Sequence, residues 1–329
     1  MNIITKTIKR THSGQEVFLF LLIIVLILVI ATISNTTYRL ENFFDLLKSS
    51  SSYLVLAIAV LLVMLSGGID VSFSSIAAVT AYVTIHYQNT HGGGNVWQAF
   101  LIAGLLGVGL GAINAVLISF FNLPALIVTL ATSNIFFGLL LENVPTAHIS
   151  KVPEWVGKFG SGRIFELTNA AGNTYGLSYL AFTSLVLLAI FAIALRYTGL
   201  GRNIYAIGSS REAARRAGIS IWRTQFFIYC FVGFLSGIAS ILNISLISYV
   251  NPFNIQAVTM DVIAAVVLGG AALSGGKGSI IGSFLGVAIL FLIKNSLVQL
   301  GVPSTWDSII VGSVLIISIA ITMIRSESN

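Results

Sequence analysis

The chain has 329 residues, of which 56% are hydrophobic and only 9% are charged, and its formal net charge is +6. This composition excludes an ordinary soluble domain, in which about 25% of residues are charged. The basic balance does not indicate nucleic-acid binding, since most of the basic residues are explained as loop charges that orient helices in a bilayer.

Long apolar runs predict an all-α polytopic membrane protein. Val17–Ile33 and Leu177–Leu195 are nearly uninterrupted, and such runs approach the roughly 20 residues that cross the hydrocarbon core as a helix. The alternating segments of about ten residues that build a transmembrane β-barrel are absent. About ten membrane-spanning helices are therefore expected, over residues 17–34, 53–66, 71–87, 97–121, 124–141, 177–195, 224–247, 258–273, 279–300 and 306–324.

The first run is expected to stay in the protein as a helix. Lys6, Lys9 and Arg10 precede it, as in a signal peptide, but no convincing small-residue cleavage site follows it. Ten spans place both termini on one side of the membrane. That side then receives eleven Lys and Arg and the other side five, with Lys294 inside a span, so the termini are predicted to be cytoplasmic.

Charge gathers in the loop 196–223, which holds six of the seventeen basic residues. Its segment GSSREAARRAGIS predicts a short surface helix, because Ser209 and Glu212 have the spacing of a capping box. Gly218 is suited to end this helix in the left-handed conformation, and Arg211 and Arg215 lie one turn apart on one face. This helix is expected to contact another protein on the cytoplasmic side, with anionic lipid as the alternative.

Three blocks resemble the permeases of bacterial ABC importers of the ribose and branched-chain amino acid superfamily. They are LSGGIDVSFSSIAA at 65–78, TGLGRNIYAIGSSREAARRAGIS at 198–220 and MDVIAAVVLGGAALSGGKGSIIGSFLG at 260–286. The likeness extends over almost the whole chain and is nearest to permeases for ribose and simple sugars, which include importers of furanosyl autoinducers. Phe73 and Ser74 depart from it, since the family usually has a valine-glycine pair there.

The resemblance implies one permease domain over 1–329 with a type II ABC importer fold, in the inner membrane of a bacterium. It implies a non-catalytic subunit without cofactor or metal, and ATP hydrolysis by a separate ATP-binding cassette subunit. The other implied partners are a second permease chain, identical or paralogous, an extracytoplasmic sugar-binding protein and the lipid bilayer, without nucleic acid. The loop helix would be the coupling helix that docks on the ATPase, formed by Ser209, Ser210, Arg211, Glu212, Ala213, Ala214, Arg215, Arg216, Ala217 and Gly218.

A polyhydroxylated solute needs polar groups inside the bundle, because unpaired hydroxyls are costly in a dry path. The residues predicted to line the pathway are Asn114, Asn122, Asn134, Asp70 and Asp261. The two aspartates lie beside glycine-rich turns and are interpreted as caps of broken helices, with a proton relay as the alternative.

The sequence excludes an ATPase and leaves three alternative functions open. LSGG occurs at 65–68 and 273–276 and is typical of ABC ATPases, but no phosphate-binding G-x-x-x-x-G-K-[ST] loop exists in the chain. A nucleoside ABC permease, a proton-coupled secondary transporter and a structural scaffold remain as alternatives.

The glycines of 107/111, 233/237 and 278/282/286 have the spacing of close helix packing in lipid.

Overall fold

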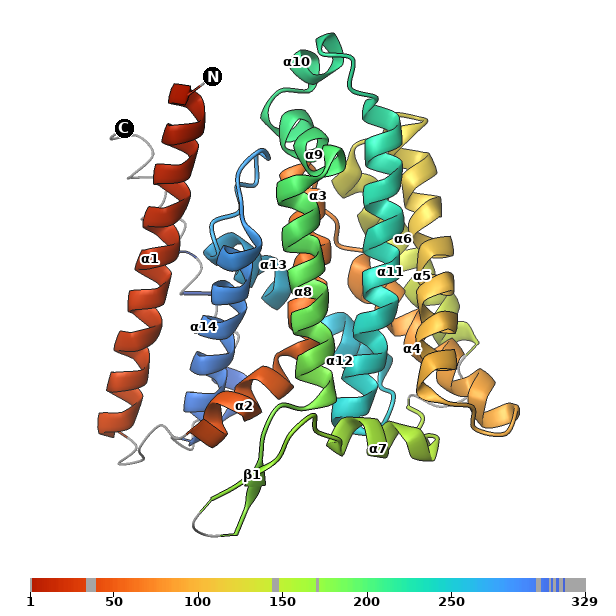
Figure 1. Ribbon diagram of the computed structural model, residues 1–329. Helices are drawn as coiled ribbons and strands as arrows, with labels where there is room; N and C mark the ends of the chain where they lie inside the picture. Colours follow the sequence, from red (N-terminus) through yellow and green to blue (C-terminus); the bar gives the residue numbers. More distant parts are fainter. Residues whose placement is uncertain are drawn as a thin grey trace.

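The computed structural model describes residues 2–33, 40–143, 148–169, 172–299, 303–307, 309, 312–313 and 316. The chain is mostly helical, with one short β-hairpin (Figure 1). The elements in chain order are α1 Asn2–Ile33, α2 Leu40–Ser49, α3 Ser51–Leu65, α4 Phe73–Thr90, α5 Val96–Ser119, α6 Ala125–Glu142, α7 Glu154–Ser161, β1 Leu167–Thr168, β2 Thr174–Tyr175, α8 Tyr179–Tyr197, α9 Gly199–Ser209, α10 Arg211–Arg216, α11 Ile221–Ile247, α12 Pro252–Ala257, α13 Thr259–Leu268, α14 Ile280–Gln299 and the 3-10 helix η1 Ser304–Trp306.

Within the described residues, five helices are long and apolar enough to cross a membrane: α5, α6, α8, α11 and α14 up to Leu297. The pair α2 and α3 passes the same test together but is bent by 54°, which gives up to six spans. Shorter apolar stretches cover 14–29 in α1 and 252–268 in α12 and α13. The tenth predicted helix, 306–324, lies mostly outside the described residues. These lengths and compositions are those of a polytopic membrane protein.

The predicted spans differ from the observed helices chiefly at their ends. The predicted spans 71–87 and 258–273 correspond to α4 and to the ten-residue α13. The short elements α2, α7, α9, α12 and the hairpin have no counterpart in the prediction, because apolar run length does not detect short or amphipathic elements.

Helix α3 forms the centre of the bundle. Every one of its residues except Tyr53 is buried, and it packs against α8, α11, α13 and α14. A helix that is apolar on all sides belongs in the interior of a protein rather than at its lipid surface. Its burial therefore fixes where the segments at its two ends lie.

The glycines of α5 and α11 pack against each other. A Cβ atom added at Gly107 would overlap the backbone of Gly233, and one added at Gly237 would overlap the backbone of Ala103. The predicted close packing is confirmed here, since small residues let helix backbones approach in lipid.

The third set of glycines is confirmed only in part. Gly282 and Gly286 of α14 lie against the backbone of Gly269 and Ala265. Gly278 precedes the helix and has a φ of +148°. The prediction that it shares their helix face is therefore wrong, because the turn before α14 uses it as a loop residue.

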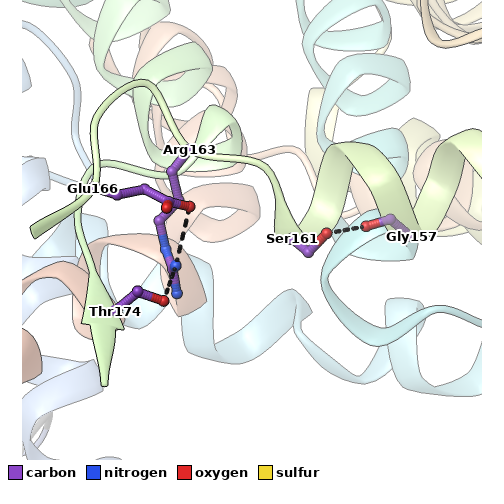
Figure 2. Close-up of polar contacts among 5 residues, drawn as sticks. All are labelled: Gly157, Ser161, Arg163, Glu166 and Thr174. Atoms are coloured by element: carbon purple, nitrogen blue, oxygen red, sulfur yellow. Dashed lines mark hydrogen bonds and ion pairs between the residues drawn. The ribbon is translucent and has the colours of Figure 1, made fainter. Parts of the chain in front are cut away.

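The two ends of the molecule carry different elements (Figure 1). Helices α9 and α10 project at the end where α1 begins, and α2, α7 and the hairpin lie at the opposite end. There Arg163 donates a hydrogen bond to Thr174 Oγ1 over 2.9 Å and pairs with Glu166 over 3.5 Å, and Ser161 bonds Gly157 within α7 (Figure 2). The Arg163 contacts join the segment before β1 to strand β2.

Candidate functional site

The charged loop folds into two capped helices rather than one. The Thr198 hydroxyl accepts a hydrogen bond from Gly201 N at the start of α9. The Ser210 hydroxyl accepts one from Ala213 N at the start of α10. Ser209 is the last residue of α9, and its hydroxyl donates to Tyr205 O over 2.8 Å. The predicted capping box of Ser209 is therefore wrong by one residue, because two adjacent serines offer the same local pattern.

The end of α10 agrees with the prediction from Gly218. This glycine has a φ of +79°, its N–H bonds Arg215 O, and the Ile219 N–H bonds Ala214 O, each over 3.1 Å. These two bonds form a Schellman motif, which satisfies carbonyl groups that the helix end would leave free. Helix α10 is thus fixed at both ends although it has only six residues.

The side chains of α10 divide into three environments. Ala214 is buried and attaches the helix to the protein. Glu212 and Arg216 form an exposed ion pair of 3.4 Å, and Arg215 is exposed beside them. Arg211 instead donates hydrogen bonds to Asn122 Oδ1 over 3.2 Å and to Gln225 Oε1 over 3.3 Å. Arg211 therefore connects α10 to the α5–α6 turn and to α11, while Arg215 and the Glu212–Arg216 pair lie on its exposed surface.

Three glycine-rich segments meet directly below the α9–α10 link. The Gly276 N–H donates to Leu65 O over 3.0 Å, and a Cβ atom added at Gly208 would overlap both of these groups. Gly275 packs in the same way on Gly67. We call this contact of 65–68, 208 and 275–276 the glycine junction. Both LSGG segments lie in it, so they serve as packing surfaces between loops.

Tyr205 of α9 reinforces the glycine junction. Its hydroxyl donates to Gly278 O over 2.9 Å, and Ser279 Oγ bonds the carboxylate of Glu16 in α1. Burial raises the pKa of the Tyr205 hydroxyl, and the nearby Glu16 charge adds to the rise. The raised pKa widens the pH range over which the neutral hydroxyl can donate this bond.

A buried polar network occupies the link between α3 and α4. Asp70 Oδ1 accepts hydrogen bonds from Ser72 N over 2.6 Å and from Ser72 Oγ over 2.7 Å. Asn114 of α5 donates to Ser72 Oγ over 2.8 Å, and Thr129 of α6 bonds the backbone at Ile69 and Val71. Asp70 thus organises the turn before α4, but it does not cap the helix as the sequence interpretation had it, because the N-cap position is Ser72.

Hydroxyl pairs connect α4 to its neighbours. Ser75 bonds Ser133 of α6 over 2.7 Å, and Thr80 bonds Ser240 of α11 over 3.2 Å. Ser74 bonds Thr259 at the start of α13 over 2.6 Å. Ser74 is one of the two departures from the family pattern, and this contact gives it a packing role.

Asp261 does not cap a helix end as the sequence interpretation had it. It forms an ion pair with Lys294 of α14, and the Lys294 ammonium lies 5.9 Å from the centre of the Tyr53 ring. The two charged side chains are 22–24% exposed. Two charges of opposite sign at such a depth stabilise each other, and loss of either leaves the other costly.

The predicted pathway residues do not form one cluster. Asp70 and Asn114 share the buried network, Asn122 lies at the α5–α6 turn with a φ of +55°, and Asp261 pairs with Lys294. Asn134 is exposed in the middle of the apolar helix α6 and donates to its own backbone at Leu130. The sequence reading missed the roles of Ser72, Lys294 and Gly208, because each depends on a contact distant in the chain.

A small cavity between α3, α4, α11 and α12 has polar groups in its wall. Ser52 Oγ and Asn243 Oδ1 line it and have no hydrogen-bond partner among the described residues. Within the part of the chain that the structure describes, no group of three or more His, Cys, Asp or Glu could hold a metal ion.

Comparison with known proteins gives a consistent set of relatives. The model of the family described as branched-chain amino acid transport system / permease component matches residues 42–319. The ribose import permease protein RbsC of Escherichia coli is 30% identical, with 89% of each chain covered. The autoinducer 2 import system permease protein LsrC of Photorhabdus luminescens is 29% identical over 94% of this chain and 90% of its own.

A probable ABC transporter permease protein of Sinorhizobium fredii is 33% identical over 85% of this chain and 80% of its own. No solved structure matches the chain.

Proposed function

Because this chain belongs to the family of branched-chain amino acid transport permease components and is similar to sugar importers of that family, we propose that it forms the membrane path for a simple sugar. The chain is a multi-pass membrane protein of the ABC permease class. Its proposed solute is a monosaccharide, either a ribose-like sugar or a furanosyl autoinducer, and a nucleoside is the alternative to be tested.

The observation that carries this proposal is the construction of α10. Ser210 and Gly218 fix its two ends, and Ala214 is buried on its inner face. Arg211 connects it to the α5–α6 turn. A six-residue helix gains little stability from its own backbone, so this support keeps it in one orientation. Arg215 remains exposed for a partner. We assign that partner as a separate ATP-binding subunit, which hydrolyses ATP while this chain performs no catalysis.

The glycine junction suits the transmission of motion from that partner. It joins the α9–α10 link to the end of α3 and to the loop before α14 through direct backbone contact. Backbone atoms that touch cannot absorb a displacement by side-chain rotation. A shift of α10 therefore moves the α3–α4 and α13–α14 links with it, and the permease changes state when ATP is bound and hydrolysed.

The proposed topology has ten spans with both termini in the cytoplasm, and one domain covers residues 1–329. Two observations support this topology. Helix α10 and the start of α1 lie at the same end of the molecule (Figure 1), and that side has the excess of basic residues. The tenth span is the predicted helix 306–324.

A second permease chain, identical or paralogous, is proposed to complete the pathway. Asn134 supports this arrangement, because an exposed amide in the middle of an apolar helix is disfavoured against lipid and suits a polar path. The other proposed pathway residues are Asn122, Asn114, Asp70 and Asp261. Of these, Asn114, Asp70 and Asp261 contact other side chains of the bundle, and they are proposed to shape the pathway through these contacts. Helix α7 and the hairpin at the opposite end are the proposed docking face for an extracytoplasmic sugar-binding protein.

Uptake into proteoliposomes tests the proposal. The chain is reconstituted with its ATP-binding subunit and binding protein, and labelled ribose, other monosaccharides and nucleosides are supplied. Uptake of a monosaccharide that needs ATP inside and persists without a proton gradient supports the assignment. Uptake of nucleosides alone, or uptake driven by a proton gradient without ATP, contradicts it.

A further inference from the structure

The α3–α4 link buries a carboxyl group that has no cationic partner. Asp70 is 1% exposed and Asn114 is fully buried. None of the ion pairs formed by the described residues includes Asp70. An ionised carboxylate is strongly disfavoured in such surroundings unless it is paired or fully hydrogen-bonded.

The hydrogen bonds of this network leave two acceptors unmatched. Both donors of Ser72 go to Asp70 Oδ1, and Asn114 uses its amide N–H to reach the same serine hydroxyl. No donor among the described residues reaches Asp70 Oδ2 or Asn114 Oδ1. The two orphaned oxygens belong to side chains that are held together through one hydroxyl group.

We propose that Asp70 is a proton-binding site, in which Oδ2 carries a proton and donates it to Asn114 Oδ1. One proton then satisfies both orphaned acceptors and removes the buried charge. The bonds from Ser72 to Oδ1 remain, since a neutral carboxylic acid still accepts hydrogen bonds through its carbonyl oxygen. The acid and the amide together join the link before α4 to α5.

The groups that oppose this assignment are the Ser72 hydroxyl and the backbone N–H groups of Ser72 and Phe73, which favour a charged carboxylate. Helices α5 and α6 contribute Asn114 and Thr129, which do not titrate. The titratable or charged groups that face the network are the buried Tyr229 of α11, whose hydroxyl lies beside Gly68, and beyond it Arg211 of α10. The start of α4 favours negative charge nearby, but Ser72 directs that stabilisation to Oδ1 and leaves Oδ2 without a donor.

The bound proton has a structural role, because it joins the link before α4 to α5 through Asp70 and Asn114. Asp70 and Asp261 consequently differ in kind, although both lie within the apolar bundle. Asp261 is paired with Lys294, whereas Asp70 has no cationic partner among the described residues. The same substitution, Asp→Asn, should therefore leave stability unchanged at Asp70 and lower it at Asp261.

Infrared spectroscopy of the full-length protein in lipid nanodiscs tests the proposal without reference to transport. The wild type should show the carbonyl stretch of a protonated carboxylic acid at neutral pH, and this band should be lost in Asp70→Asn and kept in Asp261→Asn. In a thermal unfolding assay, Asp70→Asn should melt like the wild type, since asparagine accepts from Ser72 and donates to Asn114. Asp261→Asn should melt lower, because Lys294 loses its partner.

Three results overturn the proposal: no protonated-acid band in the wild type, a band that survives Asp70→Asn, or an Asp70→Asn variant that is destabilised as much as Asp70→Ala. An ionised carboxylate bridged to Asn114 by water gives the first and the third. Wild-type protein labelled with carbon-13 at the aspartate carboxyl assigns the band even where a variant does not fold.

Discussion

Alanine at Gly208 should disconnect the charged loop from the membrane helices. The added Cβ atom overlaps Leu65 O and Gly276 N, which are backbone atoms and cannot move aside by rotation. It also separates the two groups that form the 3.0 Å hydrogen bond of the glycine junction.

The size of the effect follows from these two losses. A hydrogen bond of this kind contributes about 1 kcal/mol, and overpacking a close contact costs about 1–3 kcal/mol. Their sum, about 2–4 kcal/mol, corresponds to a roughly 30- to 700-fold shift in the equilibrium between the docked and undocked loop. Membrane insertion should be unaffected, because the apolar runs are unchanged.

The measurement compares Gly208→Ala with Gly199→Ala in proteoliposomes that contain the partner subunits. Gly199 lies in the same loop, and the nearest atom to its added Cβ is a guanidinium nitrogen of Arg202 at 3.7 Å, so alanine fits there. We expect Gly208→Ala to insert, to melt at a lower temperature and to lose uptake, while Gly199→Ala resembles the wild type. Equal uptake and melting of the two variants would refute the role of the glycine junction.

Reversing the charges of Arg215 and Arg216 to glutamate should abolish co-purification with the ATP-binding subunit without reducing the amount of protein in the membrane, because lost interfacial charge pairs cost about 2–5 kcal/mol; a stable complex would place the docking surface elsewhere. Gly282→Ala should lower the melting temperature nearly as much as Gly282→Leu, since even a Cβ overlaps the facing backbone; wild-type melting of the alanine variant would mean that this face is open. Arg211→Ala and Asn122→Ala should each reduce the ATP-driven uptake. If the two residues act through their shared bond, the double variant should keep as much uptake as the single variant with the lower uptake; fully additive losses would show that they act separately.

The membrane class and most long helices could be predicted from the sequence, since apolar run length reports directly on burial in lipid or in the bundle. The packing of Gly107 on Gly233 was predictable in kind, because small residues four apart have few other uses in a membrane helix. The identity of the facing helix was not predictable, since glycine spacing does not say which helix lies opposite.

The site was predictable only where its cause is local. The end of α10 at Gly218 depends on a few neighbouring residues, and the sequence indicates it correctly. The pairing of Asp261 with Lys294 joins residues 33 positions apart, and Arg211 reaches Asn122 across 89. Such contacts are set by tertiary packing, which a single sequence does not display.

The central claim is that this chain couples a sugar-binding protein on one side of the membrane to an ATPase on the other. The most direct test measures ATP hydrolysis by the reconstituted assembly with and without the sugar-loaded binding protein. We expect no hydrolysis by the chain alone, activity when the ATP-binding subunit is added, and a further rise with the loaded binding protein that Gly208→Ala removes. Hydrolysis that does not respond to the binding protein, or saturable nucleotide binding by the isolated chain, would contradict the claim.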